Sequence, residues 1–413
     1  MIIAEDPMET TNDEDIITEG KYIIIRRTFD KNSYKLVKIG SEKFCFMGKQ
    51  KISIASLKGQ KFGSTFELMT NDRTLKLVNF HDYVLSRKTD SSEPKDNRFL
   101  TDKNSSQKLS RDDIEKIKKE VSGQEIVKTL VENSATFENK NKFSQQKYLA
   151  KKQKKYVNLY TVLKPNIKFL MEMYYAKGPV KNGCLRTDSL SQLLTLCNVM
   201  AGGDYMVVDS NLGILSAALM ERTGGQGHIV QVHVETIPSG SSRQAVQALN
   251  YPQNTVAGCL LSLSLDDVCR IDLEKKKKTE EGEVTAEVSG DVGAAQPSIS
   301  TKKELRLQEV SRAQELLRGR EMHGLLMLTK EHDPGSIADI LLEYLGLSRP
   351  FVIFSASIEP LKACFAQLKR KCLYLRLSET FLRKYQVLDD RTRPDMVMAA
   401  SSGFILSGIK AEM

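Results

Sequence analysis

The residues with the clearest chemical pattern lie in the segment GGDYMVVDSNLGILSAAL, residues 202–219. An apolar run ends in Asp209, and a tight turn then leads into a helical pattern. Loops of the form D-x-G-x-G-x-G hold S-adenosylmethionine in methyltransferases, because the backbone must approach the cofactor without an intervening Cβ. In register with Asp209, the three glycine positions hold Asn211, Gly213 and Leu215. The segment thus has the outline of a cofactor loop but keeps one of its three glycines.

Two further positions of such a site also hold unsuitable residues. The second apolar run, GHIVQVHV, places His233 where an acid would hold the ribose hydroxyls, and histidine lacks the paired acceptors of a carboxylate. The fourth run ends at Leu328, where an active enzyme would carry Asp or Asn, and Asp333 follows too late. Leu215 is expected to direct its side chain toward the place of the cofactor. We therefore predict a methyltransferase-like domain that binds no cofactor; a Rossmann-like domain for another nucleotide is the alternative.

Other catalytic signatures are absent from the sequence. No GxxxxGK[ST], HExxH or GxSxG motif occurs. The five histidines show no metal-ligand spacing with the cysteines, so no metal site is predicted.

A lysine cluster between residues 140 and 155 indicates a polyanionic partner. Seven lysines occur there without an acid, interleaved with aromatic residues. On a helix Lys147, Lys151 and Lys154 share one face, where their repulsion would be relieved by a phosphate backbone. We predict that this helix binds nucleic acid through Lys147, Lys151, Lys152, Lys154 and Lys155. A solvated charged face is the alternative.

A second basic group lies near the C-terminus, in LRLSETFLRKYQVLDDRTRPDM. Arg383, Arg391 and Arg393 stand there beside Phe381 and Tyr385, a combination that suits phosphate contacts and base stacking. Salt bridges to neighbouring acids are the alternative, with four acids in reach along the chain: Glu379, Asp389, Asp390 and Asp395.

The pattern of residue types along the chain changes three times, which predicts an α+β multidomain protein. Residues 1–19 read as a disordered acidic tail, and residues 20–90 as a small β-barrel of short strands with glycine turns. Residues 91–175 read as a linker and basic helices. Apolar runs alternating with amphipathic helices over 176–413 predict a doubly wound, Rossmann-like methyltransferase fold. Within it, residues 273–304 are charged and aperiodic and read as a disordered insertion.

Composition narrows the class of protein. Lysine and arginine number 61 against 52 acids, a net charge of +9, which favours a polyanion as partner. The seven cysteines form no CxxC pair and the N-terminus has no apolar signal segment, so we expect reduced thiols and a nuclear or cytosolic protein. No apolar run is long enough to span a membrane.

With these features in view, the chain resembles the non-catalytic subunit of the tRNA adenine-58 N1-methyltransferase. Five segments carry the resemblance in order: residues 96–114, 142–156, 186–219, 348–361 and 375–398. The resemblance implies an N-terminal β-barrel and a C-terminal methyltransferase-like domain that binds no cofactor, while the catalytic partner uses S-adenosylmethionine. It also implies a heterotetramer with two copies of each chain, bound to tRNA. We expect the chain to be located in the nucleus.

The resemblance assigns a supporting function to this chain, which would hold tRNA and complete the active site of its partner. The arginine-rich loop would then lie toward that partner and the RNA. Two other interpretations remain open from the residues. One is an active S-adenosylmethionine-dependent RNA methyltransferase with a divergent site, and the other is a general RNA-binding scaffold.

Overall fold

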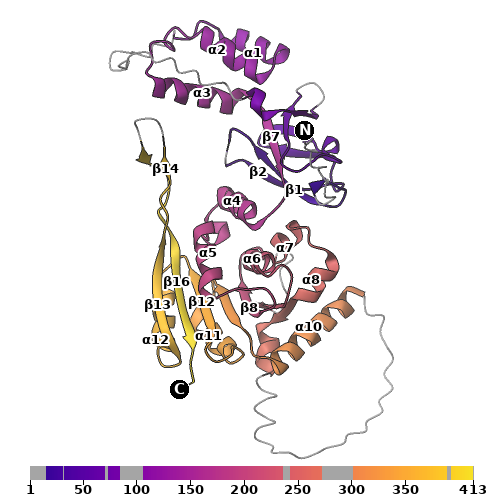
Figure 1. Cartoon of the computed structure of the whole chain (residues 1–413), viewed down its shortest axis with the longest axis vertical. Coiled ribbons are helices and arrows are strands. Elements are labelled where there is room, and N and C mark those ends of the chain that lie inside the picture. The colour runs from indigo at the N-terminus through magenta and orange to yellow at the C-terminus, as the bar shows by residue number, and fades with distance from the viewer. Residues whose placement is uncertain are drawn as a thin grey trace, which may run out of the picture. The chain divides into compact units, whose positions relative to one another are not determined.

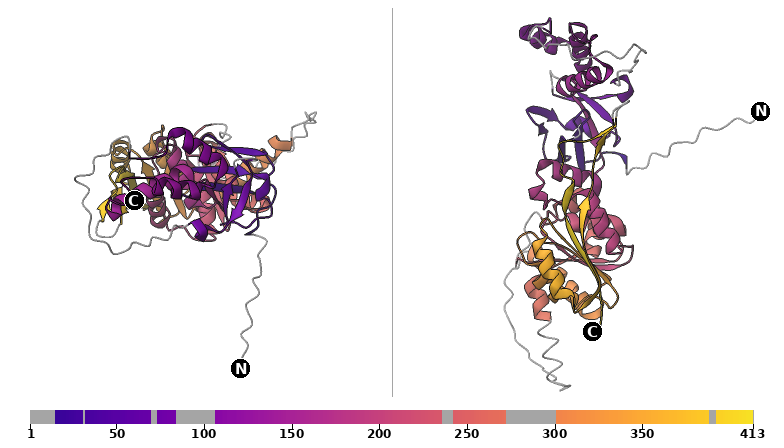
Figure 2. Two further views of the ribbon diagram at one scale, coloured as in Figure 1. Left: turned by 90° about the horizontal axis from the view of Figure 1, so that it is seen from above. Right: turned by 90° about the vertical axis from the view of Figure 1, so that its left-hand side faces the viewer.

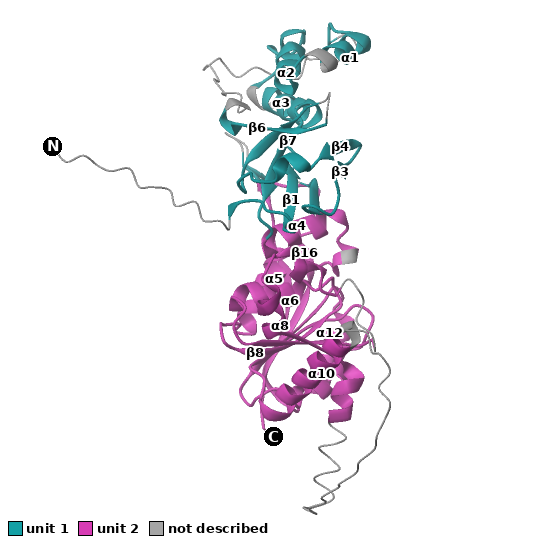
Figure 3. Ribbon diagram, turned by 90° about the vertical axis from the view of Figure 1, so that its right-hand side faces the viewer, with its two compact units in different colours: residues 1–165, 386–393 teal, residues 166–385, 394–413 magenta. Residues whose placement is uncertain are grey.

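The computed structural model describes residues 15–30, 32–69, 73–83, 106–235, 242–271, 301–387 and 392–412 (Figures 1 and 2). The chain divides into two compact units, coloured separately in Figure 3. Unit 1 comprises residues 1–165 and 386–393, and unit 2 comprises residues 166–385 and 394–413. The first carries the β-rich segment and the basic helices, and the second carries the α/β domain.

Unit 1 is built on a five-stranded antiparallel sheet in the order β2-β1-β7-β5-β6. Its strands are β1 (Tyr22–Arg27), β2 (Tyr34–Lys38), β5 (Thr65–Leu68), β6 (Leu75–Val78) and β7 (Leu159–Leu163). A separate hairpin, β3 (Phe44–Met47) with β4 (Gln50–Ser53), contributes to the same apolar core. Two 3-10 turns, η2 (Ala55–Leu57) and η3 (Phe80–Tyr83), complete the β part of the unit.

The structure moves two of the predicted boundaries. Strand β7 lies in the range 91–175 that was expected to hold only the linker and helices, yet it pairs with both β1 and β5. The helical segment is therefore an insertion between strands of one sheet. Strand β7 comes last in the sequence, and only its hydrogen-bonded pairing shows that it belongs to this sheet. The predicted tail, 1–19, is also too long: Ile17 is fully buried in the core, while residues 1–14 lie outside the described part.

Three helices follow the linker in unit 1: α1 (Arg111–Glu120), α2 (Gly123–Glu132) and α3 (Lys142–Tyr156). Ser110 and Ser122 begin the first two with complete capping boxes, in which each serine and the third helical residue bond to one another's backbone N–H. Ile126, Val127 and Leu130 of α2 pack into a small core with Tyr156 and the start of β7. The basic helix is thus fixed to the sheet by its C-terminal end.

Unit 2 contains a seven-stranded sheet in the order β10-β9-β8-β11-β12-β16-β13. The first five strands are parallel, and the last two are antiparallel to their neighbours. The strands are β8 (Asp204–Asp209), β9 (His228–His233), β10 (Leu260–Ser264), β11 (Gly324–Leu328), β12 (Pro350–Ser355), β13 (Cys372–Phe381) and β16 (Ser401–Lys410). The strand order reverses beside β8, which opens a crevice at the carboxyl ends of β8 and β11.

Helices cover both faces of this sheet. Met206 and Val208 of β8 face a core shared with α10 (Thr301–Gly319), α11 (Pro334–Leu342) and α12 (Glu359–Leu368). Helix α6 (Ile214–Thr223) packs on β8 and β9, and α5 (Thr187–Leu196) packs on β12 and β16. The unit also contains α4 (Ile167–Lys177), η4 (Val180–Asn182), α7 (Gln244–Ala248) and α8 (Gln253–Cys259). The predicted Rossmann-like fold is confirmed.

The predicted insertion, 273–304, falls almost wholly outside the described residues, but its last four residues begin α10. Within the described ranges, no helix combines the length and the apolar character that a membrane crossing requires.

Candidate functional site

The loop that the sequence predicts as a cofactor loop lies between β8 and α6. The carboxylate of Asp209 accepts hydrogen bonds from the backbone of this loop and of α6. The buried Asp209 accepts a hydrogen bond at Oδ1 from the Asn211 amide, at 2.9 Å. Its Oδ2 atom accepts from the amides of Leu215 and Ser216, at 2.7 and 3.2 Å. Burial raises the pKa of this carboxyl to about 6, against the pull of the three amides. Both carboxylate oxygens and the first free amides of α6 are thus already paired within the chain.

Two neighbouring segments pack against the same loop. Asn211, only 1% exposed, donates from Nδ2 to the backbone oxygen and the Oδ1 of Asn182, at 2.8 and 2.6 Å. Gly213 has a φ of 75°, and a Cβ added there would collide with the Ser242 carbonyl oxygen. Gly213 is the one glycine of the motif that remains, and its lack of a Cβ allows the backbone at Ser242 to lie close to the loop.

The remaining cavity at the carboxyl ends of β8, β9 and β11 is small. Its volume is about 220 Å³, and its lining is largely polar, with side chains including Asp209, Ser210, Leu212, His233, Glu235, Ser242, Lys330, Glu331 and His332. Pockets that enclose a ligand of the size of S-adenosylmethionine measure roughly 300–1,000 Å³. The cavity between the described residues is smaller than that range.

The predicted orientation of the Leu215 side chain, toward the place of the cofactor, is wrong. Its side chain is fully buried in unit 2 and does not line the cavity. Leu212, which has a positive φ of 55°, occupies the lining instead. The sequence register was right, but the turn directs the side chain of Leu215 inward.

His233 and Leu328 end their strands as predicted. The His233 Nε2 atom lies 2.7 Å from the Ser262 Oγ, and burial with two nearby arginines lowers the pKa of the imidazole to about 4. A neutral ring engaged with a serine cannot provide the two acceptors that ribose hydroxyls require. Together with the paired oxygens of Asp209 and the limited volume, these residues do not fit S-adenosylmethionine.

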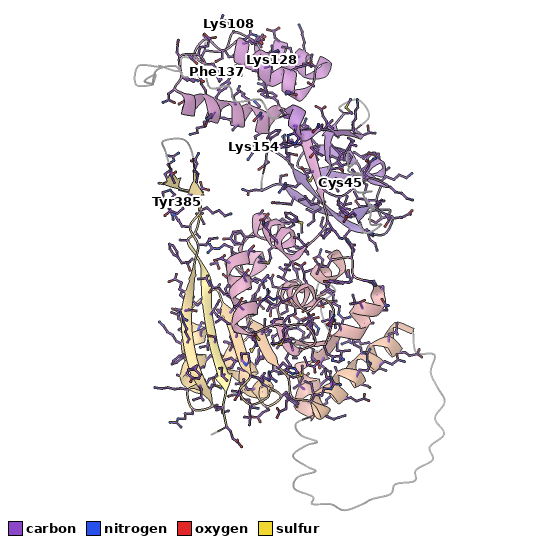
Figure 4. All side chains as sticks on the ribbon, in the orientation of Figure 1. Cys45, Lys108, Lys128, Phe137, Lys154 and Tyr385 are labelled. Atoms are coloured by element: carbon purple, nitrogen blue, oxygen red, sulfur yellow. The ribbon has the colours of Figure 1, made fainter. Side chains whose placement is uncertain are left out.

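The basic helix α3 presents most of its lysines to solvent. Lys147, Lys151 and Lys155 are exposed, and Lys152 is half-buried. Lys147 and Lys151 have no ion pair or hydrogen bond with any described residue. Lys154, labelled in Figure 4, pairs with Asp30 at 3.0 Å, so its charge is partly neutralised by an acid far away in the sequence.

Three lysines, Lys140, Lys152 and Lys155, make cation–π contacts with aromatic rings of α3. The Nζ of Lys152 lies 5.1 Å from the centroid of the Tyr148 ring, and the Nζ of Lys155 lies 5.1 Å from that of Tyr156. Lys140 approaches the Tyr148 ring at 5.2 Å. These cation–π contacts orient the ammonium groups without neutralising them, so the surface stays positive.

The predicted arginine loop belongs to a hairpin between β13 and β16, and we call its described residues, 381–387 and 392–400, the arm. Its short strands β14 (Tyr385–Gln386) and β15 (Arg393–Pro394) pair with each other. Arg383 forms no ion pair with Glu379 or Asp395, and Arg393 donates from Nε to the Gln386 Oε1 at 3.4 Å. Arg391, Asp389 and Asp390 lie outside the described residues.

The arm also exposes an apolar surface. Phe381 is 70% exposed and Val397 is 97% exposed, and Tyr385, labelled in Figure 4, is 58% exposed. Strand β13 forms an edge of the sheet, where Tyr374 is 83% exposed. Large apolar side chains on an edge strand and its extension are typical of a protein interface.

The base of the arm is fixed by residues that sequence reasoning missed. Arg186, at the start of α5, bonds to the carbonyl oxygens of Ala399 and Ala400 at 2.8 and 2.9 Å. Its Nε and a terminal nitrogen also bond to both Asp188 carboxylate oxygens, at 2.6 and 2.8 Å. No motif indicated this clamp, because the arginine lies far along the chain from the arm and its partners there are backbone atoms.

A set of buried hydroxyls reinforces the clamp. Ser189 donates to the Thr380 Oγ1 at 3.1 Å and shares a short hydrogen bond with Ser402. Thr380 and Ser402 belong to the neighbouring strands β13 and β16, with their oxygens 2.9 Å apart. The first turn of α5 therefore ties both strands together where the arm leaves the sheet. Within the described ranges, no group of three acid, histidine or cysteine side chains could hold a metal ion.

Comparisons with known proteins give the family of this chain. The Gcd10p family model matches residues 16–291. The chain is 32% identical, over 95% of its length and 88% of the relative, to the tRNA (adenine(58)-N(1))-methyltransferase non-catalytic subunit TRM6 of Mus musculus. It is also 32% identical, over 96% of its length and 79% of the relative, to the corresponding subunit of Dictyostelium discoideum.

A solved structure supports the fold. The SAM-dependent O-methyltransferase of Thermotoga maritima superposes with a TM-score of 0.51 at 11% identity, over 98% of this chain and 97% of that one. At that identity the likeness concerns the fold alone. With a family model matching more than half of its length and two relatives at 32% identity, this chain belongs to the Gcd10p family.

Proposed function

We propose that this chain is the non-catalytic, tRNA-binding subunit of the complex that methylates N1 of adenosine 58 in tRNA. Its relatives in the mouse and in Dictyostelium, which match nearly the whole of this chain, are named as non-catalytic subunits of the tRNA (adenine(58)-N(1))-methyltransferase. The observation that carries the proposal is the state of the loop after β8, where Asp209 closes on its own helix and Asn182 and Ser242 pack against it. From a methyltransferase fold with such a loop we expect support of catalysis through another chain.

The proposed contribution of this chain is to hold tRNA and to complete the active site of its partner. Lys147, Lys151, Lys152 and Lys155 would contact the phosphate backbone, with Lys154 adding less because it pairs with Asp30. Holding the substrate in one orientation replaces lost translational and rotational freedom before the chemical step. The catalytic partner would bind S-adenosylmethionine, which supplies the methyl group.

The arm and the edge strand β13 are the proposed docking surface for the catalytic subunit. Phe381, Tyr385 and Val397 supply exposed apolar area there, and Arg383 and Arg393 lie among them. Aromatic residues and arginines are enriched at the centres of protein interfaces. We further propose two copies of each chain in the complex and a nuclear location, for which the lysine-rich run 151–155 provides a basic signal.

The test is methyl transfer to tRNA from labelled S-adenosylmethionine, with this chain alone, with the co-purified catalytic partner, and with the partner alone. We expect transfer only when both chains are present, and no saturable binding of S-adenosylmethionine to this chain by calorimetry. Transfer by this chain alone would establish an active enzyme with a divergent site. Copurification without any methyltransferase, together with RNA binding, would establish a general RNA scaffold.

A further inference from the structure

The β3–β4 hairpin of unit 1 exposes aromatic side chains on its outer face. Along β3 the residues alternate, with Cys45 and Met47 buried in the core and Phe44 and Phe46 turned outward. Phe46 is 59% exposed and Phe44 is 38% exposed. Two phenylalanines in alternate positions of one strand form a flat apolar surface that the fold of this unit does not use.

The hairpin is held firmly from its inner side. Cys45 lies opposite Ile52 in the strand pair, and both pack in the core. The Tyr160 hydroxyl of β7 donates to the Gln50 Oε1 in a short hydrogen bond, which joins β4 to the centre of the five-stranded sheet. Gly48, with a φ of 62°, opens the two-residue turn between the strands. The outward phenylalanines are therefore presented on a rigid support.

The charge around these rings is positive. Three lysines belong to the hairpin and its ends, Lys43, Lys49 and Lys51, against one neighbouring acid, Glu42. Lys51 lies opposite Phe46 in the register and places its Nζ 4.1 Å from the centroid of the Phe44 ring. Lys43 and Lys49 are exposed at the two ends of β3. The rings and the ammonium groups of the hairpin thus share one surface.

We propose that this hairpin is a second RNA-binding surface, on which Phe44 and Phe46 stack unpaired nucleobases while Lys43, Lys49 and Lys51 contact the adjoining phosphates. Aromatic side chains on a strand, flanked by lysines, are the arrangement by which β-sheets bind single-stranded RNA. An apolar protein partner would leave these ammonium groups without counter-charges, whereas every nucleotide brings both a flat base and a phosphate. The inference rests on the proposed binding of tRNA and adds the recognition of unpaired nucleotides.

Substitutions at Phe46 test the stacking directly in the full chain. Phe46→Leu keeps apolar bulk but removes the ring, and Phe46→Tyr keeps the ring. Leu77, which is 54% exposed on β6 of the same unit, supplies the matched control Leu77→Ala. Affinity is measured by fluorescence anisotropy with three labelled RNAs: a tRNA transcript, a single-stranded octanucleotide of adenosine, and a blunt duplex of eight base pairs.

For Phe46→Leu we expect about a tenfold weaker affinity for the single strand, since one base stack accounts for a loss of that order. Phe46→Tyr and Leu77→Ala should bind as the unsubstituted chain does, and affinity for the duplex should not change in any variant. Unchanged binding of the octanucleotide and of tRNA by Phe46→Leu would overturn the inference while leaving the proposed function intact. Absence of tRNA binding by the unsubstituted chain would instead contradict the proposed function.

A fluorescence measurement gives a second readout. The chain contains no tryptophan, so Phe46→Trp introduces a single tryptophan at the proposed contact, which can be excited selectively above the tyrosine absorption. A stacked base should quench its emission in proportion to the bound octanucleotide, whereas Leu77→Trp should keep its emission. Equal responses of both variants, or loss of a copurifying protein with RNA binding unchanged in Phe46→Leu, would show that the hairpin does not stack bases.

Discussion

The Oδ2 atom of Asp209 accepts a hydrogen bond from the Leu215 amide at 2.7 Å, so the acid that ends β8 caps the helix that follows it. In a cofactor loop with three glycines, this turn leaves room for a ligand between strand and helix. Here the carboxylate satisfies the amides that a helix start leaves free, and buries itself in doing so. The loop thereby stabilises the fold through these hydrogen bonds of Asp209.

Replacing Asp209 with asparagine should destabilise unit 2. The carboxamide of the new side chain would turn its NH₂ group toward backbone donors, which leaves buried N–H groups unpaired and lowers the free energy of unfolding by about 1–3 kcal/mol at pH 7. Burial raises the pKa of Asp209 from 3.8 to about 6, so the native chain gains stability from this group as the pH falls from about 6 toward 4. The gap in unfolding free energy between the native chain and Asp209→Asn should therefore widen over that interval.

Urea unfolding at pH 7, 6 and 5, followed by circular dichroism, measures this gap. Asp333→Asn is a suitable control, because Asp333 caps α11 but is exposed and has a lowered pKa. A gap that narrows as the pH falls would show that Asp209 does not carry a raised pKa.

His233 predicts the opposite dependence on pH. Because its folded pKa is lowered to about 4 from 6.5, the neutral imidazole contributes stability above pH 6.5 that is lost as the pH falls toward 4. His233→Gln removes the titration and keeps a polar side chain beside Ser262. Melting temperatures between pH 7 and 5 should fall less for the variant than for the native chain, and parallel decreases would contradict the buried, neutral state.

Lys147 and Lys151, which form no ion pair with a described residue, should contribute to RNA binding by α3. Lys147→Ala with Lys151→Ala should weaken tRNA binding and reduce the slope of log K against log salt by about 1.5, since each phosphate that is no longer neutralised accounts for roughly 0.7–0.9. Lys154→Ala should have a smaller effect, because Asp30 lies 3.0 Å from its ammonium group. Filter binding at several salt concentrations separates the two variants, and equal slopes in both variants and the native chain would remove α3 from the RNA surface.

Arg186 is a positioning residue in the proposed complex, because it reaches the partner only through the arm. Arg186→Gln breaks the bonds to the Ala399 and Ala400 carbonyls and should weaken association with the catalytic subunit about tenfold while the sheet stays folded. Arg186→Lys should restore part of the affinity, since one ammonium cannot reach both carbonyls and Asp188 together.

Arg312 offers the matched control, because it also donates to a backbone carbonyl, that of Ala257 at 3.0 Å, away from the arm. Affinity for the partner is measured by surface plasmon resonance, with near-UV circular dichroism of each variant alone. Equal weakening in Arg186→Gln and Arg312→Gln would indicate general destabilisation and not positioning of the arm.

Local patterns were sufficient for the parts of the site that depend on neighbours in sequence. The ends of β9 and β11 at His233 and Leu328 follow from apolar runs, since a buried parallel strand must be apolar on both faces. The serine caps of α1 and α2 and the helical face of Lys147 and Lys151 arise within a few residues of each other. Such features depend on residues that are close in the sequence, so they can be predicted without the tertiary structure.

Interactions across long sequence distances were decided only by the tertiary structure. The sequence by itself determined a methyltransferase-like α/β domain whose loop at 209–215 lacks two of three glycines, together with a lysine-rich helix. Only the folded chain decided that Asn182 and Ser242 pack against that loop, that Asp30 neutralises Lys154, and that Arg186 ties down the arm. These partners come from turns and backbone carbonyls, which carry no periodicity and no residue preference that a linear pattern could reveal.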